Sequence, residues 1–209
     1  MKFKNSIKLS MFWNQIQMWR ELYILKKWMR QTKESVAPQV LKRGVLFSMA
    51  AERQIKTLVE TGTYLGDTIM AGLVRFDEIY SIEIQPELHD RAKRIFAGNS
   101  KVELYQGDSG EQLGQIVPQL KESVVFWLDG HYSGHITGKG GQDTPIYKEL
   151  DTVLASPFAH LIIIDDAREF GTNPHYPTLD ELKAYLSQSG RRHDWMVIAD
   201  VIIIELLAV

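Results

Sequence analysis

The sequence predicts an α/β fold in which helices cover both faces of a mostly parallel β-sheet. From Gln54 onward, short apolar runs alternate with helical segments, which is the pattern of parallel strands joined by crossover helices. The last two apolar runs are separated only by Ala199-Asp200. No helix fits in that gap, so these two runs are expected to form an antiparallel hairpin.

The alternation predicts a seven-stranded, Rossmann-like sheet that closes with the C-terminal antiparallel hairpin. The expected strands span Ile55–Glu60, Ile79–Glu83, Val102–Gln106, Val124–Leu128, Leu161–Ile164, Trp195–Ile198 and Val201–Leu206. The expected helices span Thr68–Arg75, Pro86–Phe96, Glu111–Leu120, Pro145–Leu154 and Thr178–Ser187. Pro86 suits a first helical turn, Thr178 and Glu181 have the spacing of a capping box, and Pro118 should end or distort its helix.

Length and composition indicate one soluble globular domain with an N-terminal extension. The chain has 209 residues, of which 44% are hydrophobic and 24% charged. We expect the extension to cover residues 1–37 and the domain to cover residues 38–209. The absence of cysteine excludes disulfides, thiolate metal sites and cysteine nucleophiles. No signal peptide is evident and the longest apolar run is too short to span a bilayer, so a cytoplasmic protein is expected.

Positive charge is concentrated at the start of the chain. Residues 1–35 contain eight Lys or Arg residues and two acids, whereas the whole chain has a net charge of −2. The same segment holds Trp13, Trp19, Trp28 and Tyr23. A basic, aromatic, helical extension can pack on its own domain or on a second subunit, or it can lie peripherally on an anionic membrane. Packing or homo-oligomerisation is the simpler interpretation, and nucleic acid is not expected as a partner.

A glycine-containing turn follows the first strand and is paired with an acid at the end of the second. The turn reads Glu60-Thr61-Gly62-Thr63-Tyr64-Leu65-Gly66, and Glu83 follows about 20 residues later. Glycines let the backbone approach a ligand closely, and an acid at the second strand's tip can accept both ribose hydroxyls. A carboxylate just before the turn would repel a pyrophosphate, so a nucleoside with a cationic or amino-bearing group fits better than a dinucleotide.

This layout resembles the class I S-adenosylmethionine-dependent methyltransferases. The resemblance implies that S-adenosylmethionine (SAM) is the cofactor and that Glu83 holds its ribose. It further implies that Asp108 and Ser109 approach the adenine edge. The methionine portion would lie along the turn and the helix after it, at Glu60, Gly62, Thr63, Tyr64, Gly66 and Thr68, with Asp129 close by.

A second group of acids follows the fourth and fifth strands. Asp129 ends one strand, and Asp165 and Asp166 end its expected neighbour, so three carboxylates should converge. Mutual repulsion would be relieved by protons or by a hard cation such as Mg²⁺. This arrangement resembles the metal-dependent O-methyltransferases of the catechol and macrolide-sugar types, in which the ion binds the acceptor oxygens. The alternative is that Asp165 caps a helix, Asp166 is solvated and no metal binds.

A long polar, glycine-rich segment, residues 129–143, follows the fourth strand and is expected to border the acceptor site. His131 is a candidate general base because its unperturbed pKa is about 6.5. An equally weighted alternative is that His131 acts only as a hydrogen-bonding residue further from the reaction. Tyr132 and Tyr176 would suit a sugar or aryl ring.

The sequence therefore favours SAM-dependent O-methylation of a small-molecule or glycan hydroxyl, with Asp129 and His131 as catalytic candidates and a divalent cation as helper. Two alternatives remain open. The same fold could transfer aminopropyl groups, with the acids forming a polyamine groove. A non-catalytic domain could instead use its basic extension to bind a membrane or partner.

Overall fold

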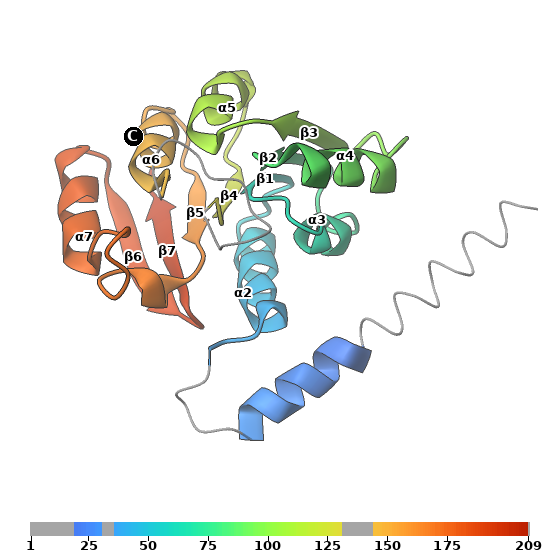
Figure 1. Cartoon of the computed structure of the whole chain (residues 1–209). Coiled ribbons are helices and arrows are strands. Elements are labelled where there is room, and N and C mark those ends of the chain that lie inside the picture. The colour runs from blue at the N-terminus through green and yellow to red at the C-terminus, as the bar shows by residue number, and fades with distance from the viewer. Residues whose placement is uncertain (1–18, 31–35, 131–143, 209) are drawn as a thin grey trace, which may run out of the picture.

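The computed structural model of the chain describes residues 19–30, 36–130 and 144–208. A seven-stranded sheet forms its centre, with the strand order β3-β2-β1-β4-β5-β7-β6 (Figure 1). β1 to β5 pair in parallel, whereas β7 runs antiparallel to both β5 and β6. The predicted fold class, including the closing hairpin, is confirmed.

The strands lie within a residue or two of their predicted bounds. They are β1 Thr57–Thr61, β2 Glu78–Glu83, β3 Val102–Gln106, β4 Val125–Leu128, β5 Leu161–Ile164, β6 His193–Ile198 and β7 Val201–Leu206. The hairpin turns at Ala199 and Asp200, whose φ angles of 51° and 64° are both left-handed. Two successive left-handed residues match the right-handed twist of the paired strands, so a two-residue loop is enough.

The helices include one that the sequence did not predict. They are α2 Gln39–Glu52, α3 Asp67–Gly72, α4 Pro86–Ile95, α5 Ser109–Ile116, α6 Ile146–Leu154 and α7 Leu179–Gln188, with short 3₁₀ turns η1 Val117–Gln119 and η2 Ala167–Glu169. Pro118 ends α5 as expected, and Thr178 and Glu181 form the predicted capping box on α7. The missed helix is α2, which follows Pro38 and buries Leu46 and Ala50 in the core.

The helices form two layers, one on each face of the sheet (Figure 1). Phe126 and Leu128 of β4 belong to a core cluster shared with α5, α6 and α7. Val125 and Trp127 belong to a second cluster shared with α2, α3 and α4. Because alternate side chains of a strand point to opposite faces, a strand that is apolar throughout is buried on both sides.

Residues 19–30 form a further helix outside these two layers (Figure 1), called here the arm helix. It is the described part of the predicted extension, and residues 1–18 and 31–35 lie outside the described residues. An ion pair between Glu21 and Arg43 joins the arm helix to α2. Across the described segments, no helix is both long and apolar enough to cross a membrane.

The ends of β1 and β4 touch through the glycine turn. Gly62 has a φ of 83°, and a Cβ on it would lie 2.5 Å from the carbonyl oxygen of Asp129. The Gly62 amide donates to the Ile82 carbonyl at 2.9 Å, which also ties the turn to β2. Only glycine fits both the backbone angle and the contact.

We expect Gly62→Ala to destabilise the protein by at least about 1 kcal/mol more than Gly98→Ala. Gly98 is a matched control, since its φ of 78° is also left-handed but a Cβ there meets nothing within 4 Å. Thermal and urea unfolding of both variants would measure the difference. Equal losses would show that the contact with Asp129 relaxes without cost.

Candidate functional site

The carboxyl ends of four neighbouring strands bring most of the predicted site residues to one edge of the sheet. Glu60 lies near the end of β1, Glu83 ends β2, Asp129 follows β4, and Asp165 and Asp166 follow β5. Four of these five side chains belong to buried residues; Asp129 is half-buried. Ligands of open parallel sheets bind at this edge, near the point where the strand order reverses, which here lies between β1 and β4.

Glu83 is held in place by the backbone of two loops. Its Oε2 accepts a hydrogen bond from the Tyr64 amide at 2.8 Å, and its Oε1 accepts one from the Gln85 amide at 2.9 Å. Tyr64 reaches this position with a left-handed φ of 46°. Each carboxylate oxygen keeps a second lone pair, so a pre-oriented Glu83 can still accept hydroxyl groups from a ligand.

Glu60 lies beneath the turn and is buried. Burial raises the pKa of Glu60 to about 8, although hydrogen bonds from Ser81 and Thr68 act in the opposite direction. The Ser81 hydroxyl donates to its Oε2 at 2.7 Å and also pairs with the Thr63 hydroxyl at 2.6 Å. The predicted positions Thr63 and Thr68 thus surround Glu60. A carboxyl with a pKa near neutrality can gain charge when a cationic ligand binds above it.

Gly66 and the Asp108-Ser109 pair also have clear structural roles. Gly66 begins α3 with a φ of 82° and lies so close to Phe96 that a Cβ would be 2.9 Å from the ring. Asp108 caps α5 by accepting from the Glu111 amide at 3.2 Å, and it forms an ion pair with Lys148. Ser109 is buried in the first turn of α5. Asp108 therefore stabilises the fold whether or not it also borders a ligand.

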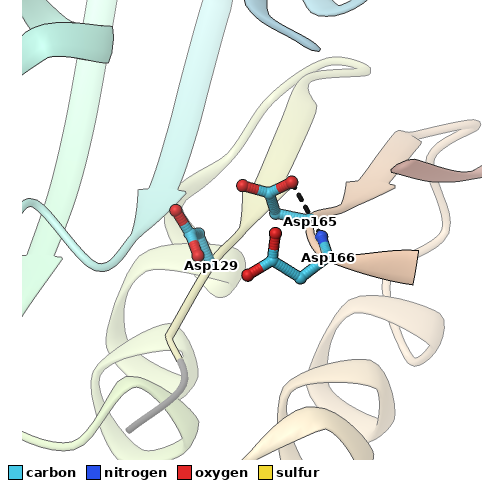
Figure 2. A group of neighbouring side chains, drawn as sticks. All are labelled: Asp129, Asp165 and Asp166. Carbon is cyan, nitrogen blue, oxygen red and sulfur yellow. Dashed lines mark hydrogen bonds between the residues drawn. The ribbon is translucent and has the colours of Figure 1, made fainter. Parts of the chain in front are cut away.

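The three acids predicted as metal ligands do converge. Asp129, Asp165 and Asp166 each offer a carboxylate oxygen, and these oxygens lie within 4.8 Å of one another. Figure 2 shows the Asp129 side chain beside the Asp165–Asp166 pair, at the ends of β4 and β5. Asp166 has a left-handed φ of 56°, and its amide donates to Asp165 Oδ1 at 2.7 Å. The strained turn brings two successive carboxylates to the same place.

A buried lysine that sequence reasoning missed lies against this cluster. Lys42 of α2 places its Nζ 2.6 Å from both Asp165 and Asp166 and 3.1 Å from Asp200 of the β6–β7 turn. Its side chain is 1% exposed. Burial alone lowers the pKa of Lys42, but Asp165 and Asp166 outweigh that effect and hold the pKa above its usual value. The lysine is therefore a fixed positive charge within the site.

Two further side chains contact the acidic cluster. Arg168 forms ion pairs with Asp166 and Asp200, and Gln39 donates to Asp165 Oδ2 at 3.0 Å. Asp129, Asp165 and Asp166 thus offer carboxylate oxygens at one place. A hard divalent cation prefers oxygen ligands of this kind, so the donor set fits such an ion.

A second residue that the sequence analysis missed is Glu149 of α6. It is 1% exposed, and burial raises its pKa to about 7, while hydrogen bonding with Ser109 and Thr61 works against the rise. A Cβ on Gly130 would lie 3.0 Å from its Oε1. Glu149 follows Ile146 by three residues and precedes Leu150 and Val153 on the apolar face of α6. In the sequence, the available signal for a buried acid was the position of Glu149 within the apolar stripe of this helix.

Most of the polar segment after Asp129, including His131 and Tyr132, lies outside the described residues. Tyr176 is half-buried, and its ring packs edge-on against Phe170 at 5.1 Å. Burial and the nearby carboxylates, Asp166 first among them, raise the pKa of its hydroxyl. Tyr176 thus lies near the acidic cluster.

Comparison with solved structures shows which fold this is. The O-methyltransferase TomG from Streptomyces achromogenes, solved in complex with SAM, superposes with a TM-score of 0.56 at 17% identity, covering 84% of this chain and 83% of that chain. The O-methyltransferase from Bacillus cereus, solved with SAH, gives 0.55 at 16% identity over 90% and 89% of the two chains. SAH-bound PaMTH1 from Podospora anserina, a methyltransferase, gives 0.55 at 20% identity over 80% and 78%.

These similarities show that the chain has the class I methyltransferase fold found in SAM-dependent O-methyltransferases. The fold part of the resemblance inferred from the glycine turn and the closing hairpin is thereby confirmed. No family model and no curated protein sequence matches the chain.

We expect Lys42→Met to destabilise the protein by roughly 3–5 kcal/mol, because it leaves buried carboxylates without their cation. Thermal unfolding would measure the loss, and lowering the pH to protonate the carboxylates should recover part of it. Lys148→Met is the matched control, since Lys148 also contacts two acids but is half-exposed. Equal effects of the two substitutions would contradict a special role for Lys42.

Proposed function

We propose that the protein is a SAM-dependent methyltransferase that methylates a hydroxyl group of a small molecule or glycan. The observation that carries the proposal is the contact between two halves of one site. The glycine turn and Glu83 form a nucleoside-binding edge, and Gly62 abuts the backbone of Asp129, where the acidic cluster begins. A cofactor lying along the turn would therefore present its reactive end to the cluster.

Each part of the cofactor has a counterpart at this edge. We assign Glu83 to the ribose hydroxyls, since its oxygens are fixed by two amides. The turn residues Gly62, Thr63, Tyr64 and Gly66, with Thr68, would border the methionine portion. Glu60, buried below them with a pKa raised to about 8, would ionise when a sulfonium and an ammonium group bind above it. Asp108 and Ser109 at the start of α5 would border the adenine.

The chemistry needs positioning and one proton acceptor. In the reaction, the bond between the methyl carbon and the sulfonium sulfur breaks while a bond to the acceptor oxygen forms, and the hydroxyl proton leaves. Holding donor and acceptor in line is the main contribution expected of the protein. Asp129 is the acid of the cluster whose backbone contacts the turn, through its amide to the Thr61 carbonyl at 3.2 Å, so we assign it to the acceptor side. His131, two residues further along, remains our candidate base.

We further propose that a divalent cation such as Mg²⁺ binds at Asp129, Asp165 and Asp166. The convergence of the three carboxylates supports this assignment. When bound, such an ion lowers the pKa of an acceptor hydroxyl. Lys42 and Gln39 already contact Asp165, so they would orient its carboxylate toward the other two.

The cofactor assignment predicts that the protein binds SAM and S-adenosylhomocysteine with micromolar affinity in calorimetric titrations. Glu83→Ala should weaken both by at least about tenfold, the cost of roughly 1.4 kcal/mol of lost hydrogen bonding. Glu78→Ala, at the exposed start of the same strand, is the matched control and should bind normally. Unchanged affinity in Glu83→Ala would remove the ribose assignment, and no binding in the wild type would refute the function.

The metal assignment predicts that Mn²⁺, used as a probe of the Mg²⁺ site, binds with a stoichiometry of one. Electron paramagnetic resonance detects free Mn²⁺ directly, so no acceptor is needed. Asp129→Asn should weaken binding strongly, whereas Asp90→Asn, an exposed acid on α4, should not. If the wild type binds no Mn²⁺ at millimolar concentration, Lys42 is the cation of the cluster and the metal assignment is wrong.

A further inference from the structure

The arm helix presents an exposed face of aromatic and basic side chains. Trp19, Tyr23, Lys26 and Arg30 follow one another at intervals of four, three and four residues, which places them along one line of a helix. Trp19 is 67% exposed and Tyr23 is 70% exposed. Large aromatic side chains gathered on an exposed helix face indicate a surface that binds something else.

More apolar and basic groups flank this line. Leu22 and Met29 are exposed on one side of it, and Lys27 and Arg20 are exposed on the other. The face therefore has an aromatic and basic centre, an apolar edge and a basic edge. No acid lies on it, since the helix's one acid, Glu21, contacts Arg43 on α2.

The opposite face of the arm helix is turned toward the rest of the protein. Glu21, Leu25 and Trp28 are half-buried, and they recur at helical spacing on that side. The ion pair of Glu21 with Arg43 fixes which face points outward. Arg43 is the neighbour of Lys42 in the sequence, so α2 links the arm helix to the acidic cluster. The exposed face is thus carried on the domain in a defined orientation.

We propose that this outward face of the arm helix binds the surface of an anionic lipid membrane. Lys26, Lys27 and Arg30 would contact anionic headgroups, while Trp19 and Tyr23 would lie at the boundary of headgroups and acyl chains. Leu22 and Met29 would enter the apolar boundary. A phosphate backbone of nucleic acid would satisfy the cations but offers no continuous apolar layer for these two side chains, so the membrane is the better match.

Charge distribution along the chain supports the same partner. Residues 1–35 carry a net charge of +6 and the whole chain carries −2, which leaves −8 on the remainder. An anionic surface would therefore attract residues 1–35 and repel the rest of the chain. A helix with a basic and aromatic face beside an apolar edge would lie in the plane of the interface.

The test is co-sedimentation of the full-length protein with vesicles. Phosphatidylcholine vesicles serve as the neutral surface, and phosphatidylcholine mixed with phosphatidylglycerol as the anionic one. We expect binding to the anionic vesicles only, and weaker binding at high salt, where surface charges are screened. Partition to both vesicle types alike, or to neither, would overturn the proposal.

Two sets of variants test separately how much the basic side chains and the aromatic side chains of the arm helix contribute to vesicle binding. The triple variant Lys26→Glu, Lys27→Glu and Arg30→Glu should lower the partition by roughly a hundredfold, and Trp19→Ala with Tyr23→Ala should lower it less but at every salt concentration. The matched control reverses three exposed basic residues of the domain, Lys93, Arg94 and Lys121, and should bind as the wild type does. Unchanged thermal unfolding and SAM titration would show that each variant is folded.

The same variants distinguish other occupants of the face. Analytical ultracentrifugation would reveal a dimer, and fluorescence anisotropy with labelled RNA and DNA duplexes would reveal nucleic-acid binding. If the triple variant abolishes dimerisation or nucleic-acid binding but leaves vesicle partition intact, the face belongs to that partner and the proposal is wrong. None of these readouts depends on methyl transfer.

Discussion

The buried ammonium group of Lys42 is the interaction on which the candidate site depends. It joins three segments that are distant in sequence, namely α2, the end of β5 and the β6–β7 turn. Without a cation among them, Asp165, Asp166 and Asp200 would repel one another and take up protons. The lysine is itself stable there only because several carboxylates compensate for its loss of water. The fold and the acidic cluster therefore require each other.

The two halves of the site use buried acids differently. Near the glycine turn, Glu60 is hydrogen-bonded to hydroxyl groups and burial raises its pKa to about 8, so its charge can respond to what binds. Glu83 is instead fixed by backbone amides and suited to hydrogen bonding. In the acidic cluster, the acids are already balanced in part by Lys42 and Arg168. Under the proposed function, this difference would give a cationic cofactor and a hard cation separate places within one edge of the sheet.

Much of the fold was predictable because its signals are local. β3, β5 and β7 match their predicted bounds, since apolar runs bounded by turn residues leave little choice. The helix α2 was missed because its buried face contains Lys42 and Arg43, which interrupt the apolar pattern expected of a core helix. Glu149 was missed for a related reason, as an acid in an apolar stripe reads as a solvated residue until its neighbours are known.

The sequence by itself determined the succession of strands along the chain, with the helices after β1. It also determined the antiparallel closure of the sheet and the presence of acids at the strand ends. These features follow from hydrophobic periodicity and loop length, which act over a few residues. Only the tertiary structure decided which charge faces those acids, because Lys42 and Asp165 are 123 residues apart. It also decided that Glu21 turns inward to Arg43, leaving the aromatic and basic line of the arm helix in water. Contacts between distant segments depend on packing, and no local pattern encodes them.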